Sequence, residues 1–303
     1  MATGREIQRR MRSVRNIRQI TKAMELIAVT RLRRAQQRVL ASRPYSSKMR
    51  ELIGEIATQA GANAGDEVVL HPLLERREVT RVGVVLMTSD RGLCGALNGN
   101  TLRAALQYSY RQQNGGKPVE FIVLGRKGML GLRHTDFPMK SEFTAIGDYP
   151  SMVKTNPIAR VAIQAFLDGE IDEAVIVYPK FVSTLKQEPT IFPLLPIDPP
   201  LALPKVSVSS EEGASRTADL MYEPDPRTLL SQLLPRFVEV QVYQSILETI
   251  ASEFSARMVA MRNATDNATE LIKELQLGYN KARQATITRE IIEVSSGAAA
   301  QGR

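Results

Sequence analysis

The sequence is poor in the residues from which many binding sites are built. It contains one cysteine, Cys94, and two histidines, His71 and His134, among 303 residues. A single cysteine excludes an intrachain disulfide and a cysteine metal cluster, and two histidines are too few for a histidine-based metal site. No run of about 18 apolar residues is present, so no segment is expected to span a membrane. The N-terminal residues lack the apolar stretch of a secretory signal, so none is expected.

Acidic residues are scarce in the first fifty positions. Residues 1–50 hold 14 Lys/Arg against Glu6 and Glu25, whereas the rest of the chain holds 26 basic and 30 acidic residues. The net charge of +8 therefore comes from one segment. Three interpretations are open: an arm that binds nucleic acid, a transit peptide, or a basic face that meets an acidic protein. Scarce serine disfavours the transit peptide, and the absence of any aromatic residue before Tyr45 disfavours the nucleic-acid arm.

Glycine and proline are also absent between Arg5 and Arg43. Apolar residues recur there at spacings of three and four, which predicts a helix with one apolar stripe. Most arginines of this segment fall outside that stripe. We expect Pro44 to perturb the helix, which then resumes through Ala60. Residues 1–60 are thus predicted to form one coiled-coil helix. About 50–55 helical residues would be roughly 80 Å long at about 1.5 Å per residue.

The C-terminal coiled-coil segment is placed at residues 210–303, and its long helix is predicted to begin at Asp225. Asp225 is suited to cap it, Pro226 suits its first position, and Pro235 is expected to kink it. Its apolar seam then alternates between steps of three and four, which favours a left-handed supercoil, but many later seam positions are small or polar. Isolated helices are marginal in water. We therefore expect this helix to pair antiparallel with residues 1–60.

Strand and helix patterns alternate between the two long helices. Apolar, β-rich runs are followed by helical stretches, with strands at 81–90, 119–125 and 172–181 and helices at 95–112, 126–133 and 156–169. This alternation predicts a parallel sheet covered on both faces. The predicted fold class is α/β: a long antiparallel coiled coil of the terminal helices with an inserted Rossmann-like domain at residues 75–205. Residues 181–197 are predicted to form a hairpin or edge strands, and 198–215 a linker or edge.

The segment "SDRGLCGALNGN" (89–100) occupies the position of a phosphate-binding loop, between a strand and a helix. It contains neither G-x-G-x-x-G nor G-x-x-x-x-G-K-[ST]. Its glycines are therefore interpreted as a tight turn with close helix–strand packing, and Cys94 as a small buried residue. No paired carboxylates, triad or metal constellation is recognisable. We expect no catalytic, cofactor-binding or metal-binding residues and no small-molecule substrate.

Four blocks in the correct order resemble one family. They are "RRMRSVRNIRQITKAMELIAVTRLRRAQ" (9–36), "SDRGLCGALNGN", "YEPDPRTLL" (222–230) and "ARMVAMRNATDNATELIKELQLGYNKARQATITREIIEVSSGAAA" (256–300). Together they resemble the gamma subunit of F-type ATP synthases. The resemblance implies a central rotor shaft that turns inside a ring of three alpha and three beta subunits. Its α/β domain would stand with the epsilon subunit on the c ring.

The resemblance also implies a cellular setting and a set of contact residues. The chain would be a non-catalytic subunit of a proton-translocating ATP synthase, peripheral to the cytoplasmic side of a bacterial cell membrane. It would couple proton flow to ATP synthesis and regulate ATPase activity. Thiol redox control is not expected, because the inserted dithiol of chloroplast members is missing. Glu223 would face the c ring. The residues implied to face the beta subunits are Met24, Arg9, Arg10, Arg31, Arg33, Arg34, Arg283, Gln284 and Thr288. The alternative is a stand-alone coiled coil that binds nucleic acid.

Overall fold

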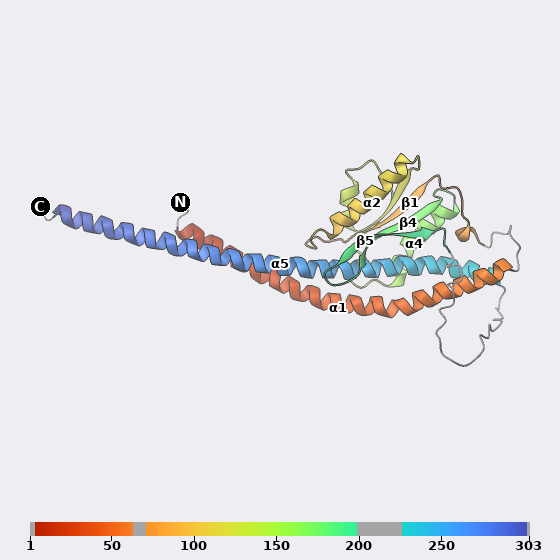
Figure 1. Cartoon of the computed structure of the whole chain (residues 1–303), viewed down its shortest axis with the longest axis horizontal. Helices are drawn as coiled ribbons and strands as arrows, with labels where there is room; N and C mark the ends of the chain where they lie inside the picture. The colour runs from red at the N-terminus through yellow and green to blue at the C-terminus, as the bar shows by residue number, and fades with distance from the viewer. Residues whose placement is uncertain (1–3, 63–70, 199–225, 302–303) are drawn as a thin grey trace, which may run out of the picture. The chain divides into compact units, whose positions relative to one another are not determined.

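The computed structural model describes residues 4–62, 71–198 and 226–301 (Figure 1). Two helices are much longer than the others, α1 (Gly4–Ala62) and α5 (Pro226–Gln301). The chain forms two compact units, one of Met1–Thr30 with Arg257–Arg303 and the other of Arg31–Ala256. Each long helix contributes to both units. The predicted linker and cap at residues 199–225 lie outside the described residues.

The second unit contains a five-stranded sheet in the order β3-β2-β1-β4-β5. The first four of these strands are parallel, and β5 is antiparallel to β4. The strands are β1 (Val82–Met87), β2 (Val119–Leu124), β3 (Met139–Phe143), β4 (Glu173–Phe181) and β5 (Gln187–Leu195). The predicted α/β class is confirmed. Strand β3 was not predicted, because its sequence MKSEF carries too few apolar residues for a buried strand.

In the described part of the chain, three shorter helices cover the sheet. They are α2 (Leu97–Asn114), α3 (Arg126–Leu132) and α4 (Met152–Leu167), and a 3-10 turn, η1 (Pro72–Leu74), precedes the first strand. Crossovers between parallel strands are right-handed. The chain moves outward from β1 to β3 through α2 and α3 and then returns to β4 through α4, so α2 and α4 cover opposite faces (Figure 1). The α2 face buries Val84, Phe121 and Val175.

Helix α5 is buried on nearly all sides from Phe237 to Ser255. On one side it meets the sheet, where the Ser252 hydroxyl donates to the Pro179 carbonyl at 2.8 Å. On the other it meets α1, where the Ser42 hydroxyl donates to the Gln244 side chain at 3.0 Å and the Gln241 amide to the Ser46 hydroxyl at 3.4 Å. Residue numbers rise on α1 as they fall on α5, so the two helices are antiparallel here.

The prolines inside the long helices do not interrupt them. Helix α1 is continuous through Pro44, and α5 is continuous from Pro226 through Pro235. Proline removes one N–H donor and crowds one carbonyl, at a cost of about 3 kcal/mol in a helix interior. In both helices that cost is offset by apolar residues on each side, such as Val39, Met49 and Leu234, which are buried. The expected perturbation at Pro44 therefore does not end the helix.

The turn between β2 and α3 requires glycine. Gly125 has φ +95°, and a Cβ there would lie 2.1 Å from the Thr88 carbonyl oxygen. The Thr88 hydroxyl accepts from the Gly128 N–H at 2.8 Å and donates to the Leu124 carbonyl at 3.0 Å. These contacts tie the end of β1 to the turn after β2, so the segment "GRKG" is structural.

Gly125→Ala should destabilise the second unit by about 3 kcal/mol, since it combines a left-handed backbone with a backbone clash. Gly169→Ala is the matched control, because Gly169 has φ +71° but no atom within 4 Å of the Cβ that alanine would add. It should cost about 1 kcal/mol. Urea unfolding of the purified chain gives both values, and equal losses would contradict this account of Gly125.

Candidate interaction surface

Within the first unit the two long helices share a narrow seam. Its buried residues are Met11, Val14, Thr21 and Ala28 on α1 with Met261 and Ala268 on α5. The Thr265 hydroxyl donates to the Thr21 hydroxyl at 2.8 Å across this seam. Small side chains allow close approach but bury little apolar area. The predicted pairing of the N-terminal and C-terminal helices is therefore confirmed, with a polar contact inside its seam.

The predicted contact residues lie mainly on the exposed sides of the helices. Met24 and Arg31 are half-buried, and the Glu223 position lies outside the described residues. The exposed members are Arg9, Arg10, Arg33, Arg34, Arg283, Gln284 and Thr288. Arg31 differs from the others because it forms an ion pair with Asp148 and lies over the Phe254 ring, 5.7 Å from its centroid. Arg31 therefore stabilises the chain itself, in addition to any contact with another subunit.

Sequence reasoning missed apolar residues that face outward on α1. Ile17, Ile20 and Ile27 are 50%, 56% and 53% exposed, next to the arginines of the same helix. Ile20 and Ile27 lie off the predicted apolar stripe, so the sequence already indicated that they face outward. Ile17 was predicted to lie on the stripe, and its exposure shows that this prediction was wrong. The exposure of these three residues indicates that the basic surface also offers apolar contacts to other molecules.

The C-terminal part of α5 is not covered by any of the residues that the structure describes in the first unit. Every residue from Arg283 to Ser296 is exposed. This end of α5 extends beyond the N-terminal end of α1 (Figure 1). These include apolar side chains that are 46–73% exposed, namely Ile287, Ile291, Ile292 and Val294. We call residues 283–296 the tail. A row of exposed branched apolar residues on one helix is typical of a surface that binds another protein.

The loop after β1 does not have the geometry of a phosphate site. The Asn98 side chain accepts from the Ser89 N–H at 3.0 Å and donates to Cys94 Sγ at 3.2 Å, and Cys94 is 2% exposed. The Asp90 carboxylate accepts from the Arg126 and Ala145 N–H groups at 3.1 and 2.9 Å. These polar groups bind one another, and the Asp90 carboxylate would repel a phosphate. The structure therefore agrees with the interpretation of this loop as a turn.

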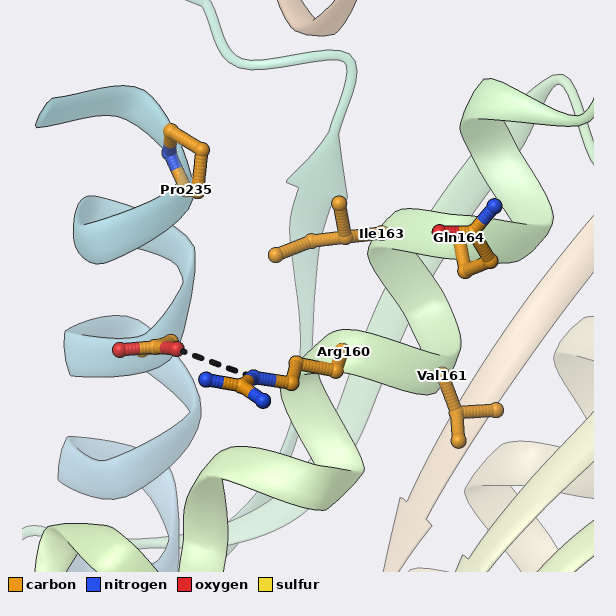
Figure 2. A pocket seen from close by; sticks show the side chains of 6 residues that line it. Arg160, Val161, Ile163, Gln164 and Pro235 are labelled. Atoms are coloured by element: carbon orange, nitrogen blue, oxygen red, sulfur yellow. Dashed lines mark ion pairs between the residues drawn. The ribbon is translucent and has the colours of Figure 1, made fainter. Parts of the chain in front are cut away.

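An open pocket lies between α4 and α5 (Figure 2). It is lined by Arg160, Val161, Ile163, Gln164, Pro235 and Glu239. Glu239 is bound by Arg160 at 3.8 Å and by Arg236 at 2.8 Å, and this carboxylate raises the pKa of Arg236. The charges of the pocket are thus engaged in holding α4 against α5.

A second buried carboxylate holds the sheet against α5. Tyr178 on β4 is 7% exposed and Glu248 on α5 is 6% exposed. Burial raises the pKa of Tyr178, and its hydrogen bond with Glu248 and the Glu248 charge raise it further. The phenol therefore stays neutral and the pair acts as a packing contact. Among the residues that the structure describes, no group of His, Cys, Asp or Glu is arranged to hold a metal ion. None of the described helices has the length and apolar character to cross a membrane.

These features define a scaffold class: two long paired helices that carry an α/β domain and present a basic surface to other molecules. A family model described as ATP synthase matches residues 3–301. ATP synthase gamma chains of Roseiflexus castenholzii and Dehalococcoides mccartyi are 47% and 49% identical, and each alignment covers 99% of both chains. The chain belongs to the ATP synthase gamma-chain family. The comparisons give no support to the nucleic-acid alternative.

Solved structures show the same fold at lower identity. A chain of the Euglena gracilis mitochondrial ATP synthase in an OSCP/F1/c-ring structure has a TM-score of 0.65 and 20% identity. That match covers 98% of this chain and 94% of the other. A chain of the Euglena rotor has a TM-score of 0.58 and 19% identity, with 94% and 98% covered.

The tail should contribute nothing to the stability of the isolated chain. The double variant Ile291→Asn/Ile292→Asn changes side chains that are 62% and 59% exposed, so stability should change by less than about 0.5 kcal/mol. Met261→Asn, at a seam residue that is 6% exposed, should cost about 2 kcal/mol or more. Thermal unfolding followed by helical circular dichroism compares them. A large loss from the tail variant would mean that these isoleucines are packed within the chain.

Proposed function

We propose that this chain is the rotating central stalk of an F-type ATP synthase. It couples ion flow through the membrane sector to ATP synthesis on a ring of alpha and beta subunits, and it is not itself catalytic. Gamma-chain relatives covering 99% of the sequence support this proposal, as does the likeness to chains of a mitochondrial rotor. We place the chain on the cytoplasmic side of a bacterial cell membrane, bound to the c ring and the epsilon subunit.

The observation that carries the proposal is the contrast between a narrow seam and a large exposed basic surface. A rotor must leave each contact with its surrounding ring and form the next. Exposed ion pairs contribute only about 0.2–1 kcal/mol each, so they can be exchanged during a turn. A fully buried large apolar side chain contributes about 1.5–3 kcal/mol and would hold the rotor at one angle. Exposed arginines such as Arg9, Arg10, Arg33 and Arg34 meet this requirement.

The contact residues are proposed to act at three levels. Arg9, Arg10, Arg33 and Arg34, together with the half-buried Met24, face acidic loops of the beta subunits. The tail residues Arg283, Gln284 and Thr288 face beta loops further along the ring. Arg31 also faces the beta subunits, but only through the part of its guanidinium that the ion pair with Asp148 leaves exposed. Glu223 faces the c ring.

A reconstitution that leaves out only this chain tests the proposal. Membrane vesicles with the membrane sector, alpha, beta and the remaining subunits should pump protons, or Na⁺, on addition of ATP only when this chain is supplied. The physical reason is that, in the proposed role, this chain is the rotating connection between the ring and the ion path. Ion uptake driven by ATP is the measurement. Equal uptake with and without the chain would contradict the proposed function.

Met24→Lys should lower the number of ions pumped per ATP hydrolysed. A lysine at this half-buried position can extend its ammonium toward the acidic beta loops. The added ion pair stabilises one rotor angle by up to about 1 kcal/mol, which slows its release up to about fivefold. Met24→Leu is the control, since it keeps the size and apolar character. The hypothesis fails if the lysine variant pumps the wild-type number of ions per ATP.

A further inference from the structure

We propose that residues 144–151, here called the strap, transmit rotation between the α/β domain and helix α1, and that Asp90 positions the strap. The strap connects β3 to α4 and passes both long helices within the second unit. This inference rests on the proposed rotor function. It assigns a mechanical role to Asp90, Asp148 and Tyr149.

The strap contacts α1 through two independent interactions. Asp148 forms an ion pair with Arg31, and both side chains are about one-third exposed. One strap residue further on, the Tyr149 ring lies under the Arg38 guanidinium, 4.6 Å from its carbon to the ring centroid. Arg31 and Arg38 are seven residues apart, which is two turns of one helix face. The strap therefore contacts a length of α1 and can resist its rotation about its own axis.

The strap also reaches α5. The Tyr243 hydroxyl donates to the Pro150 carbonyl at 3.5 Å. Arg31, which binds Asp148, also lies over the Phe254 ring of α5. Helix α5 is held directly to the sheet by Ser252 and to α4 by Glu239. The strap gives α1 its own connection to the α/β domain, so that both helices turn with it.

Asp90 fixes the path of the strap. Its carboxylate accepts from the Ala145 N–H at 2.9 Å and from the Arg126 N–H at 3.1 Å. Ala145 has φ +58° and Gly147 has φ +87°, so the strap bends through two left-handed residues. Such a conformation is unfavourable for alanine and persists where its surroundings hold it. The bond to Asp90 supplies this restraint. The loop that resembles a phosphate site by position thus serves as an anchor.

Each contact between the strap and α1 is weak, so the effect of losing one contact can be compared with the effect of losing both. An exposed ion pair or a cation–π contact changes the equilibrium between attached and detached strap by roughly two- to fivefold. The pair of contacts to α1 should therefore change this equilibrium by roughly four- to twenty-fivefold. A detached strap lets α1 lag behind the α/β domain under load. The consequence is a smaller number of ions pumped per ATP, while the fold is retained.

The experiment uses the whole complex in vesicles, with Asp90→Ala, Asp148→Asn and the double variant Asp148→Asn/Tyr149→Leu. Asp136→Asn is the matched control for loss of charge, since Asp136 is exposed on the neighbouring loop. The single variant Tyr149→Phe keeps the ring under Arg38, so its hydrogen exchange and its pumping per ATP should equal those of the wild type. Amide hydrogen exchange of residues 144–151 reports strap detachment, and ions pumped per ATP reports coupling.

We expect roughly four- to twenty-fivefold faster exchange of the strap in the double variant. Asp90→Ala should also exchange faster, and both variants should pump fewer ions per ATP. The control and Tyr149→Phe should match the wild type in both measurements. Faster exchange with unchanged pumping would overturn the coupling role, while the reconstitution result for the whole chain would still stand. Unchanged exchange in Asp90→Ala would overturn the positioning role of Asp90. An equal loss of pumping in Asp136→Asn would overturn the proposal too, because loss of charge alone would then explain the effect.

Discussion

The pairing of α1 with α5 is the interaction on which the rest of the structure depends. Isolated helices are marginal in water, and neither of these helices has a core of its own. What covers α5 changes along its length. From Phe237 to Ser255 it is buried by α1 and the sheet, whereas in the first unit it buries only a narrow seam that includes Met261 and Ala268. From Arg283 onward it is exposed. Helix α5 is therefore a core element in its first part and a paired helix in its middle part. Its C-terminal part is an exposed surface that can bind a partner.

The α/β domain keeps the architecture of ligand-binding domains but uses its loops differently. In open parallel sheets, ligands usually bind beyond the carboxyl ends of the strands. Here Thr88, Ser89 and Asp90 follow β1, and each of them bonds to another loop or helix of the same domain. Gly125 allows the β2 turn to touch Thr88. The sheet edge that commonly binds a cofactor is thus occupied by hydrogen bonds between loops and helices of the domain itself. Such bonds suit a domain that transmits mechanical force.

The sequence was sufficient where the physics is local or periodic. Buried parallel strands such as β1 are continuous apolar runs, and the three- and four-residue spacing marks both long helices. The sequence was insufficient for contacts between residues that lie far apart along the chain. Arg31 was assigned wholly to an outside partner, because nothing near it in sequence indicates Asp148, 117 residues away. Strand β3 was missed because an edge strand needs few apolar residues. Pro44 was expected to perturb the helix before it resumes, although packing on both sides of the proline keeps the helix continuous.

A thin seam and an exposed tail are costly for a protein that functions alone. Helix α5 could have ended at Ala282, where burial ends, without loss of packing in the first unit. Instead it continues with branched apolar residues such as Ile291 and Val294 in water. Exposed apolar side chains on a long helix favour aggregation unless another molecule covers them. Their retention is therefore explained by a partner. A partner that must also be released requires many weak contacts, and exposed arginines such as Arg9, Arg10 and Arg33 can supply them.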